Sequence, residues 1–305
     1  MKFFKTPNID FLSKRYWAFA FSIILAVAGF AAIMIKGPNY GIDFTGGILM
    51  QVSFDKEVQL DSVRAALNDA KELNFELQSI GDKNVIIKIQ KTEQTQEELS
   101  NGILSVLQTK FNDSKITVDR TEYVGPSVGK HLVKQTMYAF IFVFLGIIVY
   151  VAFRFKSGLW GACGVLALVH DVFCTYGLLV IMDKEINLTI VAALLTIAGF
   201  SINDTIVLYD RIRENMRLLA KENFGSIINK SINEVLSRTI ITSLTVFAVS
   251  MILFIMGGEV INGFALSMVI GTTLGVYSSV FICAPLTYEW EQRKRDRFKK
   301  AFKSK

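Results

Sequence analysis

Residues 188–209 read LTIVAALLTIAGFSINDTIVLY, and this stretch decides what kind of protein the chain forms. As an α-helix rising 1.5 Å per residue, it is long enough to cross a hydrocarbon core of about 30 Å. Asp204 is its only charged side chain. The stretch therefore predicts a transmembrane helix that carries one carboxyl group inside the membrane.

Five further apolar stretches of similar length occur in the chain. They are Tyr16–Ile35, Leu132–Phe153, Leu159–Met182, Thr239–Met256 and Gly263–Leu286. Of the 305 residues, 51% are hydrophobic and only four are proline, and the mean hydropathy is +0.40. Apolar residues gathered in blocks of about twenty are typical of membrane spans and not of a soluble domain. We therefore predict a polytopic α-helical membrane protein with six transmembrane helices.

The net charge of +6 predicts how these helices are oriented. Lysine and arginine gather in residues 1–15, 154–156, 211–238 and 287–305, whereas the short loop 183–185 is net acidic. Loops rich in lysine and arginine stay on the cytoplasmic side of a membrane. We therefore expect a protein of the inner (cytoplasmic) membrane with a cytoplasmic N-terminal segment, 1–15, and a basic cytoplasmic tail, 287–305. The lipid bilayer is its expected partner, and nothing in the pattern of basic and aromatic residues indicates nucleic acid.

Two connections between the spans are long: residues 37–131, expected outside, and residues 210–238, expected inside. The outside segment alternates strand-like and helix-like patterns. In chain order these are Ile48–Phe54, Leu60–Glu72 (helix), Phe75–Ile80, Asn84–Gln90, Glu97–Phe111 (helix) and Lys115–Val124. The order β-α-β-β-α-β predicts an extracytoplasmic α+β domain of the ferredoxin-like kind. The inside segment has apolar residues at helical spacing, which favours either an amphipathic helix on the membrane surface or a solvated helical connector.

Charged side chains inside a bilayer cost roughly 2.5–3.5 kcal/mol or more at a helix centre, so each calls for an explanation. Asp171 follows His170 near the middle of the third span, Asp204 lies in the fourth, and Arg238 precedes the fifth. The His170–Asp171 pair is open to two interpretations. It could relay protons, or it could form an ordinary hydrogen bond between helices.

The two spans joined by the segment 210–238 each carry a stripe of polar residues along one side. In the fourth span they form a stripe of Thr196, Gly199 and Asn203 and a neighbouring arc of Ser201, Asp204 and Thr205. In the fifth they are Arg238, Thr242 and Thr245, which share one face. This arrangement predicts that Asp204 and Arg238 approach each other.

Two interpretations of such a pair remain. A buried ion pair could simply fix the packing of two helices, or Asp204 could be a protonatable carboxylate with Arg238 as its cationic partner. We favour the second, because Ser or Thr could fill a packing role at lower cost. Residues predicted to form a supporting polar network are Asn203, Ser201, Thr205, Thr242, His170 and Asp171.

Glycine-containing motifs stand at both ends of the outside segment. Gly41–Gly47, which includes Asp43, Gly46 and Gly47, follows the first span, and Val124–Gly129 precedes the second. Glycines there suit a tight reversal of the chain into the first strand, and neither motif has the spacing of a phosphate-binding loop. The three cysteines show no metal or disulfide spacing. We therefore expect no metal site and no catalytic residues.

With these motifs the chain resembles the SecF branch of the SecD/SecF family, within the resistance-nodulation-division superfamily. The resemblance runs nearly end to end and rests on Gly41–Gly47, Val124–Gly129, His170-Asp171, the stretches 199–207 and 210–215, and Ser237-Arg238-Thr239. It implies a non-enzymatic accessory subunit of protein transport, acting in the Sec complex with no cofactor and with proton-motive force as energy source. It also implies that the residues matching Asp204 and Arg238 serve proton coupling.

The resemblance further implies partners. Six helices and one outside domain are half of a pseudo-symmetric twelve-helix unit, so a separate SecD chain is expected, together with the SecYEG channel and the translocating preprotein. One alternative is half of a small-molecule or lipid exporter of the same superfamily, for which a domain of about ninety residues leaves little room. An intramembrane aspartyl protease is disfavoured, because Tyr209-Asp210 lacks the partner Gly-x-Gly-Asp motif.

Overall fold

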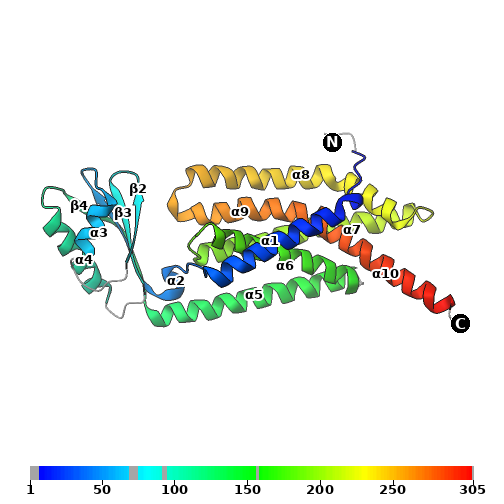
Figure 1. Ribbon diagram of the computed structural model, residues 1–305, viewed down its shortest axis with the longest axis horizontal. Helices are drawn as coiled ribbons and strands as arrows, with labels where there is room; N and C mark the ends of the chain where they lie inside the picture. Colours follow the sequence, from blue (N-terminus) through cyan, green and yellow to red (C-terminus); the bar gives the residue numbers. More distant parts are fainter. Residues whose placement is uncertain (1–6, 69–74, 91–94, 156–157, 304–305) are drawn as a thin grey trace. The chain divides into compact units, whose positions relative to one another are not determined.

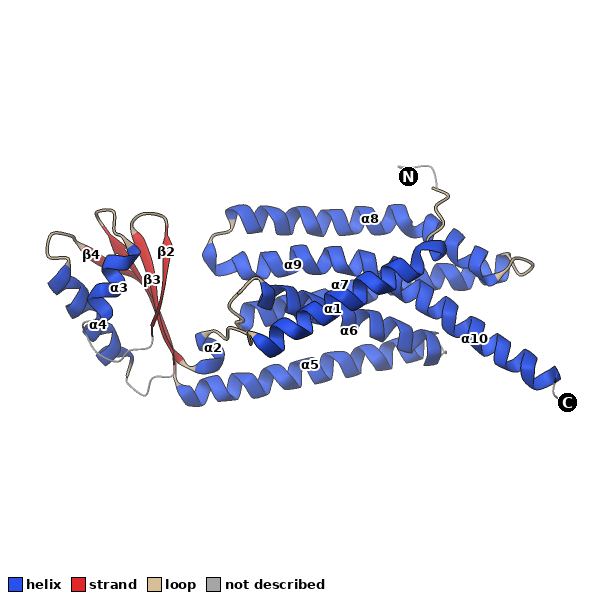
Figure 2. Cartoon of the chain, in the orientation of Figure 1, coloured by secondary structure: helices blue, strands red, loops and turns tan. Residues whose placement is uncertain are grey.

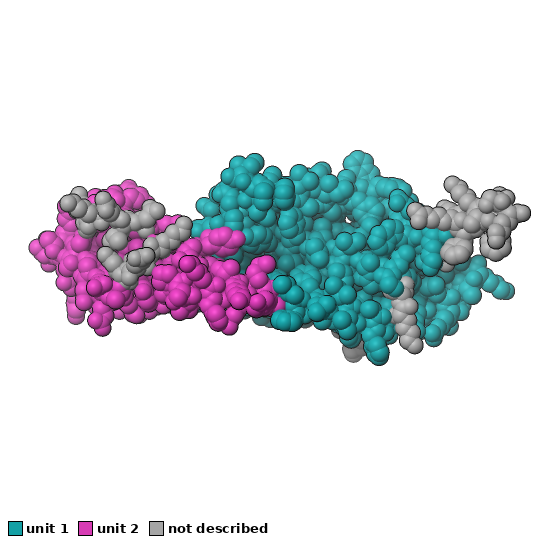
Figure 3. Space-filling view, turned by 90° about the horizontal axis from the view of Figure 1, so that it is seen from below, with its two compact units in different colours: residues 1–39, 140–305 teal, residues 40–139 magenta. Residues whose placement is uncertain are grey.

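The computed structural model describes residues 7–68, 75–90, 95–155 and 158–303. The chain forms two compact units (Figure 3). One comprises residues 1–39 and 140–305 and is helical; the other comprises residues 40–139 and contains a sheet. The second unit thus extends past the predicted domain 37–131 and includes the first residues of the following helix. Each unit is described by itself.

The helical unit is built from long helices, which are apolar except for the basic α10 (Figures 1 and 2). They are α1 (Arg15–Ile35), α5 (Pro126–Phe155), α6 (Gly158–Ile181), α7 (Leu188–Leu218), α8 (Phe224–Met256), α9 (Glu259–Ser278) and α10 (Ala284–Lys303). The π-helical segment η2 (Ser279–Cys283) joins α9 to α10, and the short 3-10 turn η1 (Leu12–Lys14) precedes α1. Among the described residues, six helices are long and apolar enough to cross a membrane. Five of them contain the corresponding stretch predicted from the sequence, most extended at one or both ends, and α6 ends one residue short of the predicted Leu159–Met182.

The segment 210–238, which was expected inside, is not a separate surface helix. Helix α7 continues to Leu218, and α8 begins at Phe224, where the Asn223 side chain accepts a hydrogen bond from the Ser226 backbone N–H at 2.8 Å. The two spans therefore simply run on beyond the apolar stretches and meet in a short turn. The apolar side chains of Ile228 and Ile232 are fully buried in a core cluster of the helical unit that also contains the Phe11 side chain. That burial explains the apolar spacing that suggested an amphipathic surface helix.

The other unit contains an antiparallel sheet with strand order β2-β3-β1-β4. The strands are β1 (Gly47–Phe54), β2 (Phe75–Ile80), β3 (Asn84–Gln90) and β4 (Ile116–Val124), and the helices are α2 (Ile42–Thr45), α3 (Leu60–Asn68) and α4 (Gln96–Lys110). Alternate residues of β1 enter the core together with apolar residues of α3 and α4. Residues 69–72 of the predicted first helix lie outside the described residues. The strand order is compatible with a ferredoxin-like domain, and that assignment stays a prediction.

Candidate functional site

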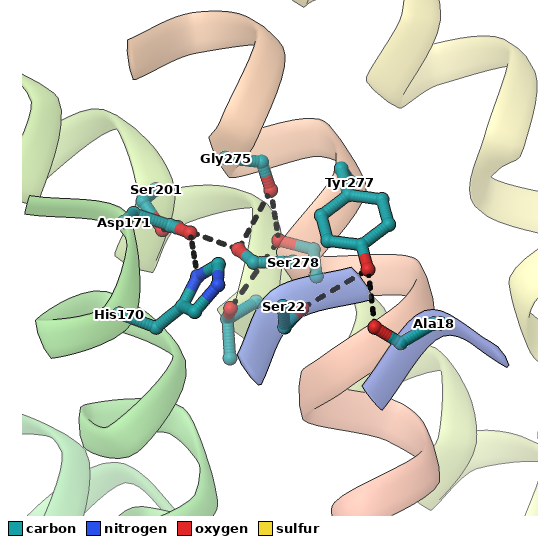
Figure 4. A network of polar contacts seen from close by, with 10 residues as sticks. Ala18, Ser22, His170, Asp171, Ser201, Gly275, Tyr277 and Ser278 are labelled. Atoms are coloured by element: carbon teal, nitrogen blue, oxygen red, sulfur yellow. Dashed lines mark hydrogen bonds and ion pairs between the residues drawn. The ribbon is translucent and has the colours of Figure 1, made fainter. Parts of the chain in front are cut away.

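The most elaborate polar site of the helical unit surrounds Asp171 on α6 (Figure 4). Its carboxylate is fully buried and accepts hydrogen bonds from Ser201 Oγ on α7 at 2.6 Å and from Ser278 Oγ on α9 at 2.5 Å. The adjacent His170 Nδ1 lies 3.0 Å from the other carboxylate oxygen. A buried carboxylate needs such partners, because an unpaired one would bear the full cost of its desolvation. Three helices are thus tied together at this point.

The same network reaches α1 through the end of α9. Tyr277 precedes Ser278 and donates its hydroxyl hydrogen to the Ala18 carbonyl oxygen at 2.7 Å, and it also hydrogen-bonds Ser22 at 3.0 Å (Figure 4). Immediately afterwards the helix widens into the π-helical segment η2. Single π-helical turns inside α-helices occur frequently at functional sites. The helix formed by α9, η2 and α10 is therefore irregular where it contacts Asp171.

Only one of the two ring nitrogens of His170 has a hydrogen-bond partner among the described residues. Its Nε2 atom is buried and has no hydrogen-bond partner among the described residues, although Nδ1 contacts Asp171. The structure thus contains the interhelical hydrogen bonds that one interpretation of His170-Asp171 expected. A proton-relay role for the pair stays a prediction.

Asp204 occupies a different environment on the same helix as Ser201. Its side chain is 3% exposed and accepts one long hydrogen bond, from Ser243 Oγ on α8 at 3.4 Å. The neighbouring Thr205 hydroxyl lies 3.4 Å from Ser279 Oγ, at the start of η2. Asp171 is therefore held by three groups at 3.0 Å or less, whereas Asp204 has a single weak partner. A carboxylate so weakly held can change its protonation with little loss of hydrogen bonding.

No ion pair joins Arg238 to Asp204 among the described residues, although the positive charge of Arg238 lies near enough to act on the Asp204 carboxylate. The Arg238 side chain is exposed. Thr242 is exposed as well, and its hydroxyl bonds the Arg238 carbonyl oxygen of its own helix at 2.8 Å. The side of α8 that faces inward carries Thr239, Ser243 and Ser250. The helical spacing was correct, but the inward face is offset by one residue from the stripe that begins at Arg238.

Helix α7 shows the same division between two polar stripes. Ser201, Asp204 and Thr205 are buried, whereas Thr196, Gly199 and Asn203 are exposed. Asn203 forms no hydrogen bond with the described residues, and it lies about 22 Å along the helix from Leu188 at 1.5 Å per residue. An amide exposed at that depth of a bilayer is costly unless a partner covers it.

The glycine motif of the other unit joins the segments that lead into and out of its sheet. Gly41 precedes α2, which contains Asp43, and Gly46 and Gly47 follow with φ of 73° and 144°. A Cβ atom on Gly47 would lie 2.1 Å from the Ile89 carbonyl oxygen, and one on Gly129 would lie 3.0 Å from the Phe44 carbonyl oxygen. Backbone therefore packs directly against backbone at this junction, which only glycine permits.

Sequence reasoning missed several residues of these sites. Gly275 and Ser279 belong to a stripe of small residues in the sixth span (Gly263, Ser267, Gly271, Gly275 and Ser279), whose spacing predicts close helix packing. Ser278 and Ser243 carry no such signal. The packing interpretation is supported at Gly271, where a Cβ atom would lie 2.2 Å from Ile197 Cδ1. Small hydroxyl residues carry no sequence signal for facing a carboxylate on another helix. Among the described residues, no group of three or more acidic, histidine or cysteine side chains is placed to hold a metal ion.

Comparisons with known proteins agree with one another. Residues 104–293 match the family model described as protein export membrane protein SecD/SecF, C-terminal, and residues 31–58 match that of the SecD/SecF GG motif. A protein translocase subunit SecF of Endomicrobium trichonymphae is 53% identical over 304 residues, covering 99% of this chain and 98% of the relative. One of Vibrio alginolyticus is 39% identical over 282 residues, covering 92% and 89%.

A solved structure is similar over most of the chain. The crystal structure of SecDF from Thermus thermophilus, described as a translocon-associated membrane protein, matches with a TM-score of 0.82 and 34% identity. The match covers 94% of this chain and 39% of the SecDF chain. This chain therefore spans well under half the length of that solved relative.

Proposed function

This chain belongs to the SecD/SecF family of protein export membrane proteins, and we propose that, as an accessory subunit of the Sec translocase, it acts with SecD to use proton-motive force in the export of preproteins. Its relatives are named as translocase subunits, which makes it a transport component. The proton coupling, the pairing with SecD and the work on the preprotein belong to the proposal.

The environment of Asp204 is the observation that carries the proton-coupling proposal. It is a buried carboxyl group within a membrane-crossing helix, and a single hydrogen bond of 3.4 Å links it to α8. A proton crossing a membrane potential of 100 mV releases about 2.3 kcal/mol. To capture that energy the protein needs a group that changes charge and a structure that responds to the change. Asp204 is the carboxyl group best placed to lose or gain a proton without breaking a network.

Two exposed polar residues support the proposal of a SecD partner. Asn203 on α7 and Arg238 on α8 both point out of the helical unit, in the membrane or at its edge. The solved SecDF chain contains a further part beyond the region that matches this chain. We infer that a SecD subunit supplies the corresponding part here and covers both residues. Ionised Asp204 would then favour one packing of α7 against α8 and SecD, and protonated Asp204 would favour another. The proton gradient could therefore shift the balance between these two conformations.

Co-purification tests the partnership. Extracted in a mild detergent, the chain should bring down SecD and the SecYEG channel. The double change Asn203→Leu and Arg238→Gln should lower the recovery of SecD several-fold, because it removes the exposed polar groups from the proposed interface. The change Ile141→Ala on the exposed side of α5 serves as the control and should leave recovery unchanged. Recovery of SecD that is equal for all three proteins would contradict the proposed interface.

The orientation of the helices is a separate prediction. Because lysine and arginine gather in the termini and at 211–238, a tag at residue 305 should be protected from external reagents in intact cells. A tag inserted near Asp82, in the turn between β2 and β3, should be accessible once the outer envelope is permeabilised. The opposite labelling pattern would refute the cytoplasmic placement of both termini.

A further inference from the structure

An open, charged cavity lies beside the ends of α5 and α7 and takes no part in the proposed proton coupling. Its volume is about 390 Å³. Its lining comprises three arginines, two acidic residues and one leucine: Arg154, Arg213, Arg217, Asp210, Glu214 and Leu218. All six residues belong to the helical unit, so the cavity does not depend on the placement of the other unit.

The acidic groups of this cavity already have cationic partners. Asp210 pairs with Arg154 at 2.5 Å, and Glu214 pairs at 2.6 Å with Arg211, which does not line the cavity. Arg213 and Arg217, in contrast, form no ion pair or hydrogen bond with the described residues. They are four residues apart on α7, so their guanidinium groups rise from the same side of the helix and repel each other. Two like charges placed together at a cavity favour an anion between them.

The length of α7 indicates that the cavity lies at the depth of lipid headgroups. Helix α7 is 31 residues long, or about 46 Å, whereas the hydrocarbon core is about 30 Å thick. Counted from Leu188, the turns that follow Asp210 therefore emerge from the hydrocarbon. Arg154 likewise ends the apolar run of α5, where Tyr150 and Phe153 are exposed. An anion in the cavity would thus have an exposed apolar helix surface beside it.

We propose that this cavity binds the phosphodiester of an anionic phospholipid, with Arg213 and Arg217 on the phosphate and the acyl chains along the exposed side of α5. The planar guanidinium matches the geometry of phosphate oxygens and stays charged at every physiological pH. Basic pockets between helices at the cytoplasmic surface are suited to such headgroups. The Arg154–Asp210 ion pair borders the cavity on the α5 side. Arg154 is a third arginine of the lining, and its charge is neutralised by Asp210 as long as this pair is intact. This inference rests on the helices crossing a bilayer and is independent of proton coupling.

The test is a binding titration of the purified full-length protein in neutral detergent with fluorescent phosphatidylglycerol, and with phosphatidylcholine as the zwitterionic comparison. We expect saturable binding of phosphatidylglycerol that is at least tenfold tighter than that of phosphatidylcholine. Each arginine near an anionic surface adds to the free energy of lipid binding. Removing both charges in the double variant Arg213→Gln, Arg217→Gln should therefore raise the dissociation constant roughly twenty- to thirtyfold. Asp210→Asn should instead strengthen binding, because the Arg154 guanidinium is then released toward the phosphate.

The matched control is Lys221→Gln with Lys230→Gln, which removes the same charge from exposed positions at the same end of the unit. It should leave the dissociation constant within about twofold of the unaltered protein. An equal loss for both double variants would mean that only net charge matters, and would overturn the site. Equal binding of the two lipids would also overturn it. Displacement of the lipid by inorganic phosphate at similar concentrations would show a site for free phosphate instead of a lipid.

Discussion

Membrane vesicles that contain Asp204→Asn in place of the unaltered chain should export preproteins at the same rate with and without a proton gradient. The amide fills the same space and can still accept the hydrogen bond from Ser243, so the helical unit should assemble normally. It cannot exchange a proton, however. Each proton that crosses 100 mV releases about 2.3 kcal/mol, which bounds the acceleration lost per proton at about fiftyfold. The measurement is the time course of protease-protected preprotein, with and without an imposed gradient.

The control for this variant is Asp210→Asn. Asp210 lies on the same helix, but its side chain is 37% exposed and pairs with Arg154 outside the buried part of the unit. A solvent-screened surface pair of this kind contributes little to stability. Export by Asp210→Asn should therefore keep its response to the gradient. If Asp204→Asn vesicles respond to the gradient as the unaltered ones do, Asp204 has only a structural role.

The position of Arg238 changes what its substitution should do. A buried ion pair with Asp204 would have made Arg238→Ala costly, because an unpaired carboxylate would remain in the membrane. The side chain is instead exposed and unpaired with Asp204, so the substitution should barely change the thermal stability of the isolated chain. Its effect should appear only in the complex with SecD, as lost gradient-dependent export.

The sequence was sufficient to predict the six spans, because apolar length is a strong signal that tertiary structure does not override. It also predicted the strands and helices of the other unit closely, since β1 alternates buried and half-buried residues with a clear period. The 210–238 segment shows the limit of that method. Helical spacing does not distinguish a surface helix from two spans that continue past the membrane, because both bury one face.

The candidate site was predictable in part. Asp171 and Asp204 stand out because charge inside a membrane is rare, and both are buried. The residues that face these two carboxyl groups depend on how the neighbouring helices are rotated about their axes. The sequence pattern along a single helix does not contain that information. Arg238 and Ser243 lie five residues apart on α8, and burial selects the serine. The π-helical turn beside Asp171 could not be predicted, because it does not change the periodicity of apolar residues in the sequence.

Gly47→Ala should unfold the 40–139 unit, or come close to doing so. The new Cβ atom would lie 2.1 Å from the Ile89 carbonyl oxygen, and the residue would have to keep a φ of 144°. Backbone strain and overpacking each cost about 1–3 kcal/mol, so we expect a loss of about 3 kcal/mol or more. For a unit of this size the loss lowers the melting temperature by more than about 12 °C. Residues 40–139 expressed alone should fold with mixed α/β circular dichroism, which makes the measurement direct.

Gly102→Ala is the matched control within the same unit. Gly102 lies in the middle of α4, and nothing lies within 4 Å of the position of an added Cβ atom. Alanine there removes the conformational cost of a helical glycine, so stability should rise by about 0.5–1 kcal/mol. A melting temperature for Gly47→Ala within about 3 °C of the unaltered unit would show that the junction tolerates a side chain, against the close backbone packing described here.

Proton flux during export is the most direct test of the proposed coupling through Asp204. Sealed vesicles that hold the chain, SecD and the SecYEG channel would carry a pH-sensitive dye, and flux would be recorded while a preprotein is being translocated. We expect proton movement that begins with translocation, stops when the preprotein is exhausted and is absent in Asp204→Asn vesicles of equal protein content. Translocation-linked flux of the same size in Asp204→Asn vesicles would contradict the account, because the protons would then pass without this carboxyl group.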